Sequence, residues 1–200
     1  MDQDTVEEAL QVVLAASGSA VAGSVQWLDE RTLHFQPDEP LARDTAYEVT
    51  LDDDARAADG NELDAAYDFS FNTVGYLEVA QVIPAPNAQD VQAESTITVI
   101  FNRPVVPLLA ISDPSYGDAP QPVTFEPSIA GEGEWINTSI YQFTPEQPLA
   151  GGTSFSAEIE AGLEDTTGGV LEETYAWSFS TSPPDVVWGT PDEEQGLVGV

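Results

Sequence analysis

Cysteine and lysine are absent from the 200-residue sequence, and histidine occurs once. These absences exclude disulfides, thiol nucleophiles, cysteine-ligated zinc and histidine-rich metal centres. Four arginines stand against 36 aspartates and glutamates, so the formal net charge is −32. Nucleic acid and anionic membrane surfaces would repel such a chain, because both attract lysine and arginine. No apolar run approaches the roughly 18 residues that predict a membrane span. We therefore expect no enzyme.

Hydrophobic residues make up 42% of the chain, which is enough for packed cores despite the charge. Fifteen glycines and fifteen prolines, together with many threonines, valines and aromatic residues, favour an all-β fold. Abundant acid without lysine is typical of proteins from high salt, and an acidic extracellular protein is the alternative. In either case self-repulsion should lower stability at low ionic strength.

The sequence contains one unit twice. A shift of 108 residues places 27–73 on 135–181 without a gap, and 13 of these 47 positions are identical. A period of this size is that of a whole domain rather than of a solenoid repeat. The identical pairs are Trp27/Trp135, Phe35/Phe143, Pro37/Pro145, Pro40/Pro148, Leu41/Leu149, Ala42/Ala150, Thr45/Thr153, Gly60/Gly168, Leu63/Leu171, Tyr67/Tyr175, Ser70/Ser178, Phe71/Phe179 and Thr73/Thr181.

Apolar residues alternate with polar ones in the matched segments, which predicts strands with one face in a core and one in water. The inward sets are Tyr47, Val49 and Leu51; Phe155, Ala157 and Ile159; Tyr67, Phe69 and Phe71; Tyr175, Trp177 and Phe179; and Ile97, Val99 and Phe101. Turn signals such as Asp59-Gly60-Asn61 and Gly151-Gly152 separate them. This pattern predicts antiparallel β-sandwiches. One helical turn is expected in Asp4–Leu10, capped by Asp4 or Thr5.

The two copies differ at their beginnings. The second opens with two expected strands, 78–83 and 96–101, for which the first has no counterpart, so the first lacks about 29 residues. After 183, the run Val186–Pro191 and then Val198 resembles the opening of the second copy. We expect a first domain over 1–74 without its N-terminal strands, a complete second domain over 76–183, and a tail over 184–200 that begins a third repeat. The short joint Val74-Gly75-Tyr76 favours a semi-rigid rod.

Each copy contains a long motif of turn residues and alternating apolar residues. In the first copy it is Leu33-His34-Phe35-Gln36-Pro37-Asp38-Glu39-Pro40-Leu41-Ala42, then Thr45-x-Tyr47-x-Val49, Asp59-Gly60-Asn61-x-Leu63 and Phe69-x-Phe71-x-Thr73. The second adds the opening Val82-x-Pro84-x-x-Asn87-Ala88-x-x-Val91, then Ile97-x-Val99-x-Phe101-Asn102-x-Pro104-Val105. With these motifs, both copies resemble the bacterial Ig-like domain of the S-layer (SbsA) type. The resemblance implies two tandem Ig-like β-sandwiches; it says little about function, because such modules serve many surface proteins.

A narrower resemblance lies in the second copy. It is similar to an N-terminal β-sandwich of bacterial alpha-2-macroglobulin-like proteins in Pro104-Val105-Val106-Pro107-Leu108, Pro122-Val123-Thr124-Phe125-Glu126-Pro127, Gly133-Glu134-Trp135 and Tyr141-Gln142-Phe143-Thr144-Pro145. This resemblance implies a parent that traps proteases, often with a Cys–Gln thioester. Without cysteine, the present segment would be scaffold.

Candidate chemistry is sparse. His34 alternates with Leu33 and Phe35, so we expect it on the solvent side of a strand rather than in a triad. A glycosidase needs two carboxylates in one cleft, which the sequence does not define. Asn137-Thr138-Ser139 fits the N-glycosylation pattern, but a plain turn is the preferred interpretation. Trp27, Trp135 and Trp177 are expected in the core rather than on a sugar-stacking face, and Trp188 belongs to the tail.

An acidic loop offers oxygen ligands for calcium, although its spacing is not that of an EF-hand. The candidate metal ligands are Asp52, Asp53, Asp54, Asp59 and Asn61. The second copy has Glu160-Ala161-Gly162 and Thr167-Gly168-Gly169 there, so the repeat does not need these acids. A solvated loop is therefore preferred, and no cofactor is expected unless it is calcium.

The sequence thus predicts a non-catalytic structural or spacer module of a secreted or cell-surface bacterial protein, in particular macroglobulin scaffold. The alternative is an adhesive or ligand-binding module, and one form of this hypothesis includes bound calcium. Expected partners are neighbouring Ig-like repeats of the parent chain and other surface proteins, not nucleic acid or membrane. The truncated domain should expose a sheet edge and part of its core, so a strand-exchange oligomer, completed by Val186–Thr190 of a neighbouring chain, is a further possibility.

Overall fold

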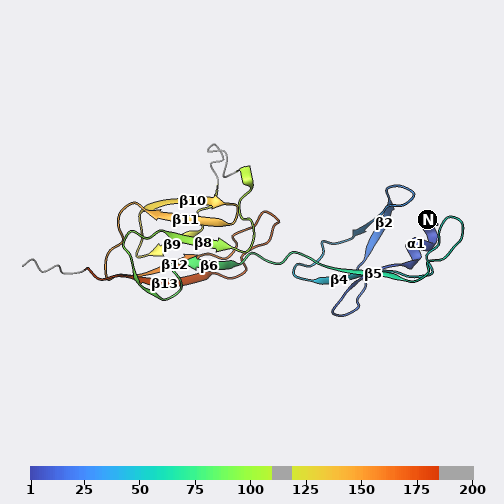
Figure 1. Ribbon diagram of the computed structural model, residues 1–200, viewed down its shortest axis with the longest axis horizontal. Helices are drawn as coiled ribbons and strands as arrows, with labels where there is room; N and C mark the ends of the chain where they lie inside the picture. Colours follow the sequence, from blue (N-terminus) through green and yellow to red (C-terminus); the bar gives the residue numbers. More distant parts are fainter. Residues whose placement is uncertain (110–118, 185–200) are drawn as a thin grey trace, which may run out of the picture. The chain divides into compact units, whose positions relative to one another are not determined.

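The computed structural model describes residues 1–109 and 119–184. The chain divides into two compact units, the first Met1–Tyr76 and the second beginning at Leu77, and each is described by itself. Strands dominate both, so the all-β prediction is confirmed (Figure 1). In these described ranges, no helix has the length and apolar character needed to cross a membrane.

The second unit is a sandwich of two four-stranded sheets. One sheet has the strand order β10-β11-β8-β6, and the other has the order β7-β13-β12-β9. Its strands are β6 (Val79–Ile83), β7 (Ala88–Val91), β8 (Ile97–Phe101), β9 (Val123–Glu126), β10 (Gly131–Asn137), β11 (Ile140–Pro145), β12 (Ser154–Ile159) and β13 (Tyr175–Thr181). All neighbours are antiparallel except β13 and β7, which run parallel.

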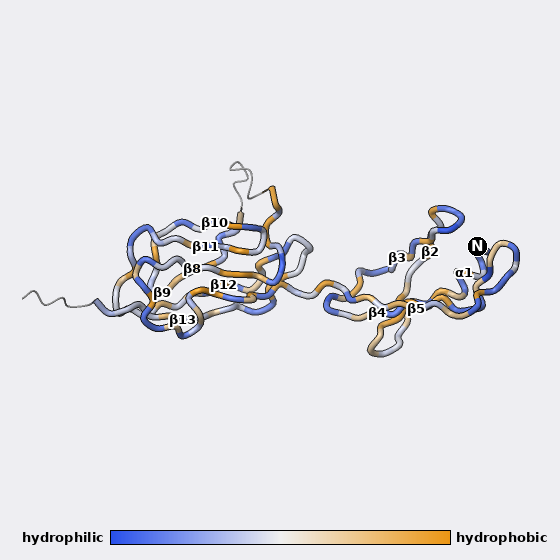
Figure 2. The backbone as a smooth tube through the Cα atoms, viewed as in Figure 1, coloured by the Kyte–Doolittle hydropathy of each residue, from blue (hydrophilic) through white to orange (hydrophobic). Residues whose placement is uncertain are grey.

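The core of the second unit lies between these sheets. Alternation with a period of two places Ile97, Val99 and Phe101 of β8 inward, at 0–3% exposure. Residues Phe155, Ala157 and Ile159 of β12 and Trp177 and Phe179 of β13 face them from the other sheet. Hydrophobic residues follow the strands, and the connecting loops are mostly hydrophilic (Figure 2). Each fully buried large side chain contributes about 1.5–3 kcal/mol, so the predicted alternation makes a large favourable contribution to the stability of this unit.

The first unit contains a smaller set of elements. They are α1 (Gln3–Ala9), β1 (Leu10–Leu14), β2 (Gly23–Trp27), β3 (Leu33–Pro37), β4 (Ala46–Leu51) and β5 (Tyr67–Asn72). Strands β1-β4-β5 form a three-stranded sheet, and β2-β3 form a hairpin. The 108-residue shift relates β2, β3, β4 and β5 to β10, β11, β12 and β13, and pairing relates β1 to β9.

Three strands of the second unit have no counterpart in the described first unit. They are β6, β7 and β8, whereas the sequence predicted only two missing strands. The omitted strand is β7, only four residues long, whose outward residues Gln89 and Asp90 gave no alternating pattern. Its neighbour in the sheet is β13, so its absence from the first unit leaves β5 at an edge.

Helix α1 is longer than the single turn that the sequence predicted. It spans seven residues, and the cap is Asp2 rather than Asp4 or Thr5. The Asp2 carboxylate accepts from the backbone N–H of Thr5 at 3.4 Å, which satisfies one of the free donors of the first turn. The helix buries Val6 and Ala9 against Ala55, so packing extends it beyond its capping signal.

One hydrogen-bonded arrangement recurs in both units and explains several identical pairs. The Thr73 hydroxyl accepts from the N–H of Thr45 at 3.0 Å and donates to the carbonyl of Ala42 at 2.6 Å. The Thr181 hydroxyl does the same with Thr153 and Ala150, at 3.0 and 2.6 Å. We call this arrangement the threonine latch. It fixes the end of β5 or β13 to the turn that precedes β4 or β12.

Backbone conformation also repeats. Gly60 and Gly168 adopt φ values of +88° and +78° in equivalent turns, which side chains with a Cβ rarely adopt. Gly152 has φ +64°, and the equivalent residue in the first unit, Asp44, has φ +49°. Aspartate tolerates this region because its short side chain can hydrogen-bond locally. The predicted turns are therefore confirmed at these positions.

Candidate interaction face

The first unit has an apolar cleft between its two sheets. Its volume is about 430 Å³, and it is bounded by the inward faces of β1, β3, β4 and β5 and by Leu41. The lining residues are Leu10, Val12, Leu33, Phe35, Pro37, Leu41, Val49, Leu51, Tyr67, Phe69 and Phe71. We call this surface the open face. Every lining residue is apolar or aromatic, so the open face offers burial rather than acid–base chemistry.

The aromatic residues of β5 correct one expectation from the sequence. Tyr67, Phe69 and Phe71 were predicted in a core, but their side chains are 64%, 48% and 37% exposed. Their counterparts Trp177 and Phe179 are 5% and 2% exposed. The predicted direction is correct, since all three line the cleft. The covering layer is missing, because no strand in the described first unit occupies the places of β6 and β8.

Two strand edges border the open face. In the second unit, β13 lies between β12 and β7, and β11 lies between β10 and β8. Among the strands of the described residues, β5 of the first unit pairs with β4 alone, and β3 pairs with β2 alone. Unpaired edges present backbone N–H and C=O groups that can receive a further strand. The prediction that this unit exposes a sheet edge and part of its core is therefore confirmed.

Strand β1 contributes to the open face, which the sequence did not predict. Leu10, Val12 and Leu14 form the strand that follows α1, and Leu10 and Val12 line the cleft. The alternation Leu10-x-Val12-x-Leu14 was the available signal, but Leu10 was assigned to the helix. Pairing of Leu10 with Leu51, equivalent to that of Val123 with Ile159, places β1 five residues out of step with the 108-residue shift.

His34 and three of the four tryptophans lie within the described residues, and none of them lines the open face. His34 is exposed on β3, as the alternation predicted. Trp135 and Trp177 are buried, at 8% and 5% exposure, which confirms their core positions. Trp27 is only partly buried and donates from Nε1 to the Glu7 carboxylate at 2.8 Å. Trp188 and the tail segment Val186–Thr190 lie outside the described residues.

The acidic loop lies between β4 and β5. Asp52 Oδ1 accepts from the backbone N–H of Asp53 at 2.8 Å, and Asp59 accepts from the backbone and side chain of Asn61. A side-chain hydrogen bond and charge repulsion from Asp52 raise the pKa of the Asp53 carboxyl above its ordinary value. Among residues 1–109 and 119–184, no three acidic or histidine side chains are gathered so as to hold a metal ion. Calcium binding by Asp54 and its neighbours stays a prediction.

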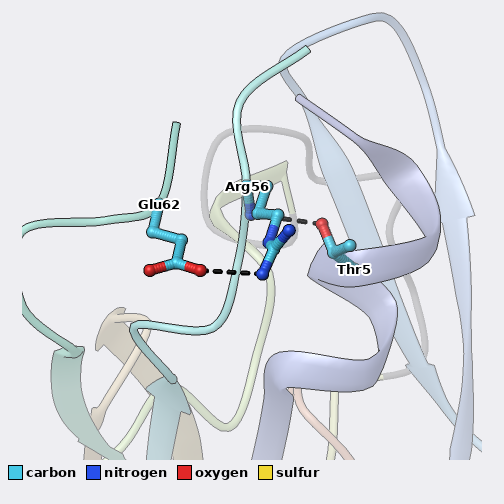
Figure 3. Close-up of polar contacts among 3 residues, drawn as sticks. All are labelled: Thr5, Arg56 and Glu62. Carbon is cyan, nitrogen blue, oxygen red and sulfur yellow. Dashed lines mark hydrogen bonds and ion pairs between the residues drawn. The ribbon is translucent and has the colours of Figure 1, made fainter. Parts of the chain in front are cut away.

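Arg56 ties this loop to the helix (Figure 3). Its guanidinium lies 2.7 Å from the Glu62 carboxylate, and its backbone N–H donates to the Thr5 hydroxyl at 3.1 Å. Both side chains of the ion pair are about half exposed, so the pair contributes about 0–1 kcal/mol. Its role is local positioning of the loop.

Two further positions are structural. Asn137, Thr138 and Ser139 form the turn between β10 and β11, where Asn137 Oδ1 accepts from the N–H of Ser139 at 2.8 Å, so the predicted turn is confirmed. The Tyr141 hydroxyl donates to Gln121 Oε1 at 2.6 Å. Burial raises the pKa of the Tyr141 hydroxyl to about 12, and Leu33 occupies the equivalent place in the first unit.

Comparison with known families assigns the fold. The chain matches the family described as the bacterial Ig-like domain over residues 1–73 and again over 75–181. It therefore belongs to the bacterial Ig-like domain family. The comparison with curated proteins finds no match.

Solved structures similar to part of the chain include two L,D-transpeptidases. One, from Mycobacterium smegmatis, is 23% identical with a TM-score of 0.37, over 53% of this chain and 40% of that one. The other, from Mycobacterium tuberculosis H37Rv, is 18% identical with a TM-score of 0.35, over 52% of this chain and 39% of that one. The chain thus spans about two fifths of the length of these proteins.

Proposed function

We propose that this chain is a non-catalytic structural module of a secreted or cell-surface bacterial protein, and that it serves as a spacer between other parts of that protein. The proposal rests on one observation: the residues that both units share have structural roles. Thr73 and Thr181 close the latch, and Gly60 and Gly168 form the turns. The shared residues maintain a fold.

The path of the chain through the second unit supports a load-bearing role. Near the start of the second unit, Leu77 forms an isolated parallel β-bridge with Leu171, which lies just before the start of β13. The last strand of the unit, β13, ends at Thr181 (Figure 1). Entry and exit are therefore separated by the length of a strand. Tension between them shears β13 along its neighbours β7 and β12, so that several backbone hydrogen bonds resist together.

The acidic exterior supports the same role. A net charge of −32 keeps like modules apart and so favours a soluble array. The family occurs typically in surface and extracellular proteins, which is the basis for the proposed location.

Force spectroscopy on the full chain, held at its two ends, tests the spacer role. The second unit should give one discrete unfolding event, with a contour gain near that of its roughly 100 residues at about 3.6 Å each. The variant Thr181→Val, which removes the latch, should lower the unfolding force, and Ser182→Ala, next to it, should not. Extension without a resolvable event would contradict a load-bearing module.

The finer proposal is scaffold of an alpha-2-macroglobulin-like protein, supported by the motifs of the second unit such as Pro122–Pro127. The reading frame that encodes this chain provides the test. A Cys-Gly-Glu-Gln thioester motif in the same frame would support it, and a complete frame without bait or thioester regions would contradict it. The alternative, a calcium-linked adhesive module, stays a prediction, and its test is given below.

A further inference from the structure

We propose that the open face of the first unit is an acceptor site for an extended polypeptide segment that carries the opening-strand pattern of this module, the pattern seen in residues 79–101. The occupant would add one strand to β5 and one to β3, and its alternate apolar side chains would fill the cleft of about 430 Å³. The second unit supplies the template, because there β6 and β8 of the opposite sheet cover the equivalent face and β7 pairs with the equivalent edge.

The first contact is a parallel strand beside β5. In the second unit, β7 places Ala88 opposite Phe179 and Val91 opposite Thr181. The N–H of Asn87 donates to the carbonyl of Ser178 at 2.7 Å, and the N–H of Ser182 donates to the carbonyl of Val91 at 2.9 Å. The 108-residue shift transfers these groups to the carbonyl of Ser70 and the N–H of Val74. These two groups define the register of the incoming strand.

The second contact is an antiparallel strand beside β3. In the second unit, Val99 lies opposite Tyr141 and Ile97 opposite Phe143, and both β8 side chains are fully buried. The equivalents of Tyr141 and Phe143 are Leu33 and Phe35, which line the open face. The donor must therefore carry apolar residues at every second position of this strand, and a register slip of one residue would turn them to water.

The chemistry of the face selects for such a segment. Tyr67, Phe69 and Phe71 present a continuous apolar strip that is 37–64% exposed, whereas the molecule as a whole carries a charge of −32. A segment with alternating apolar residues and little charge, such as residues 79–101 with two acidic residues and no basic one, satisfies both the strip and the edge hydrogen bonds. An acidic occupant, including a second copy of this chain, would have to overcome charge repulsion.

The test uses the full chain and a synthetic peptide with the sequence of residues 77–107. Hydrogen exchange and circular dichroism are followed with and without the peptide. We expect exchange in residues 33–37 and 67–74 to slow by about tenfold or more, and the melting temperature of the first unit to rise. A peptide with Ile97→Asp and Val99→Asp is the donor control.

Matched variants of the chain complete the design. Phe69→Asp should abolish protection by the peptide, because it would place a carboxylate in the apolar strip of the open face. Ile136→Asp should leave it intact, since Ile136 is also 48% exposed but lies on β10 of the second unit. A second version of the experiment joins the peptide sequence ahead of Met1 by a flexible linker, which removes the dependence on peptide solubility.

Three results would overturn the proposal. The first is unchanged exchange of β3 and β5 with both the free and the tethered segment. The second is equal protection in the Phe69→Asp variant. The third is protection of β3 and β5 in the chain alone, accompanied by concentration-dependent dimers in sedimentation, which would show that a second copy covers the face. None of these results would affect the proposed spacer role of the second unit.

Discussion

The two units apply the same strand pattern with different outcomes. In the second, β13 lies inside a sheet and its aromatic side chains are sealed by β6 and β8. In the first, β5 carries the same alternation at an edge, and its aromatic side chains line an open cleft. Alternation in a strand therefore determines the direction of a side chain, whereas burial depends on the layer that covers it. Substitutions at equivalent positions should separate these two effects.

The largest expected difference is at the centre of the cleft-facing strand. Trp177→Ala should lower the free energy of unfolding of the second unit by about 3–5 kcal/mol, because it leaves a cavity in a closed core. Phe69→Ala, at the equivalent position, should lower that of the first unit by less than about 1 kcal/mol. Denaturation followed by NMR on the indole signals of Trp135 and Trp27 reports the two units separately. Equal losses of unfolding free energy in the two units would contradict the distinction between a closed second unit and an open first unit.

The threonine latch gives a second matched pair. Thr181 is only 3% exposed, and Thr181→Val removes its hydrogen bonds to the part-buried N–H of Thr153 and carbonyl of Ala150, so we expect a loss of about 1–3 kcal/mol in the second unit. Thr73→Val removes the same bonds where water can replace them, and should lower the stability of the first unit by about 0.5–1 kcal/mol. The same NMR denaturation measures both. A larger loss at Thr73 would show that the open face is covered in solution.

Alkaline pH should affect the units differently. Above pH 10 the tyrosine of an unfolded chain releases its proton, while Tyr141 in the fold keeps its proton up to about pH 12. The contribution of Tyr141 to the free energy of unfolding of the second unit should thus be constant from neutral pH to about pH 10 and fall by roughly 1–2 kcal/mol between pH 10 and 12. Tyr141→Phe should remove this fall. If the fall persists in the variant, another group is responsible.

Calcium should have the smallest effect. For a spacer, millimolar Ca²⁺ should leave the melting curve of the full chain unchanged, since no metal-binding group of side chains is gathered in the described residues. A calcium-linked module would melt at a higher temperature with Ca²⁺, and Asp53→Ala or Asp59→Ala would abolish the shift. Calorimetry with the wild type and both variants decides between them.

Much of the fold follows from sequence periodicity. The repeat at a shift of 108 residues located β3 to β5 and β11 to β13, because the inward aromatic residues and the latch threonines recur. Strands β2 and β10 lie almost wholly before or at the start of the matched segments and were not predicted. Strand β7 was missed because its four residues are too short for an alternation. Helix α1 was predicted too short because its end depends on packing of Val6 and Ala9, not on a local signal.

A close approach of the backbone also escaped prediction. Gly23 and Gly131 are equivalent, and a Cβ at either would lie 2.5–2.6 Å from the ring of Phe35 or Phe143. Both glycines precede the matched segments 27–73 and 135–181, so the repeat did not indicate that they are equivalent. The open face was anticipated only in outline, as exposed core and edge. Its lining by Leu10 and Val12 required the pairing of β1 with β4, a long-range contact that local periodicity does not reveal.

The most direct test of the account is amide hydrogen exchange of the full chain, in solution and without additions, comparing β5 with β13. We predict slow exchange at residues 178–181 and fast exchange at the outer edge of the equivalent residues 70–73, because among the described strands β13 has β12 and β7 beside it there, whereas β5 has β4 alone. Equal protection of the two strands would contradict the central claim that one repeat is closed and the other open.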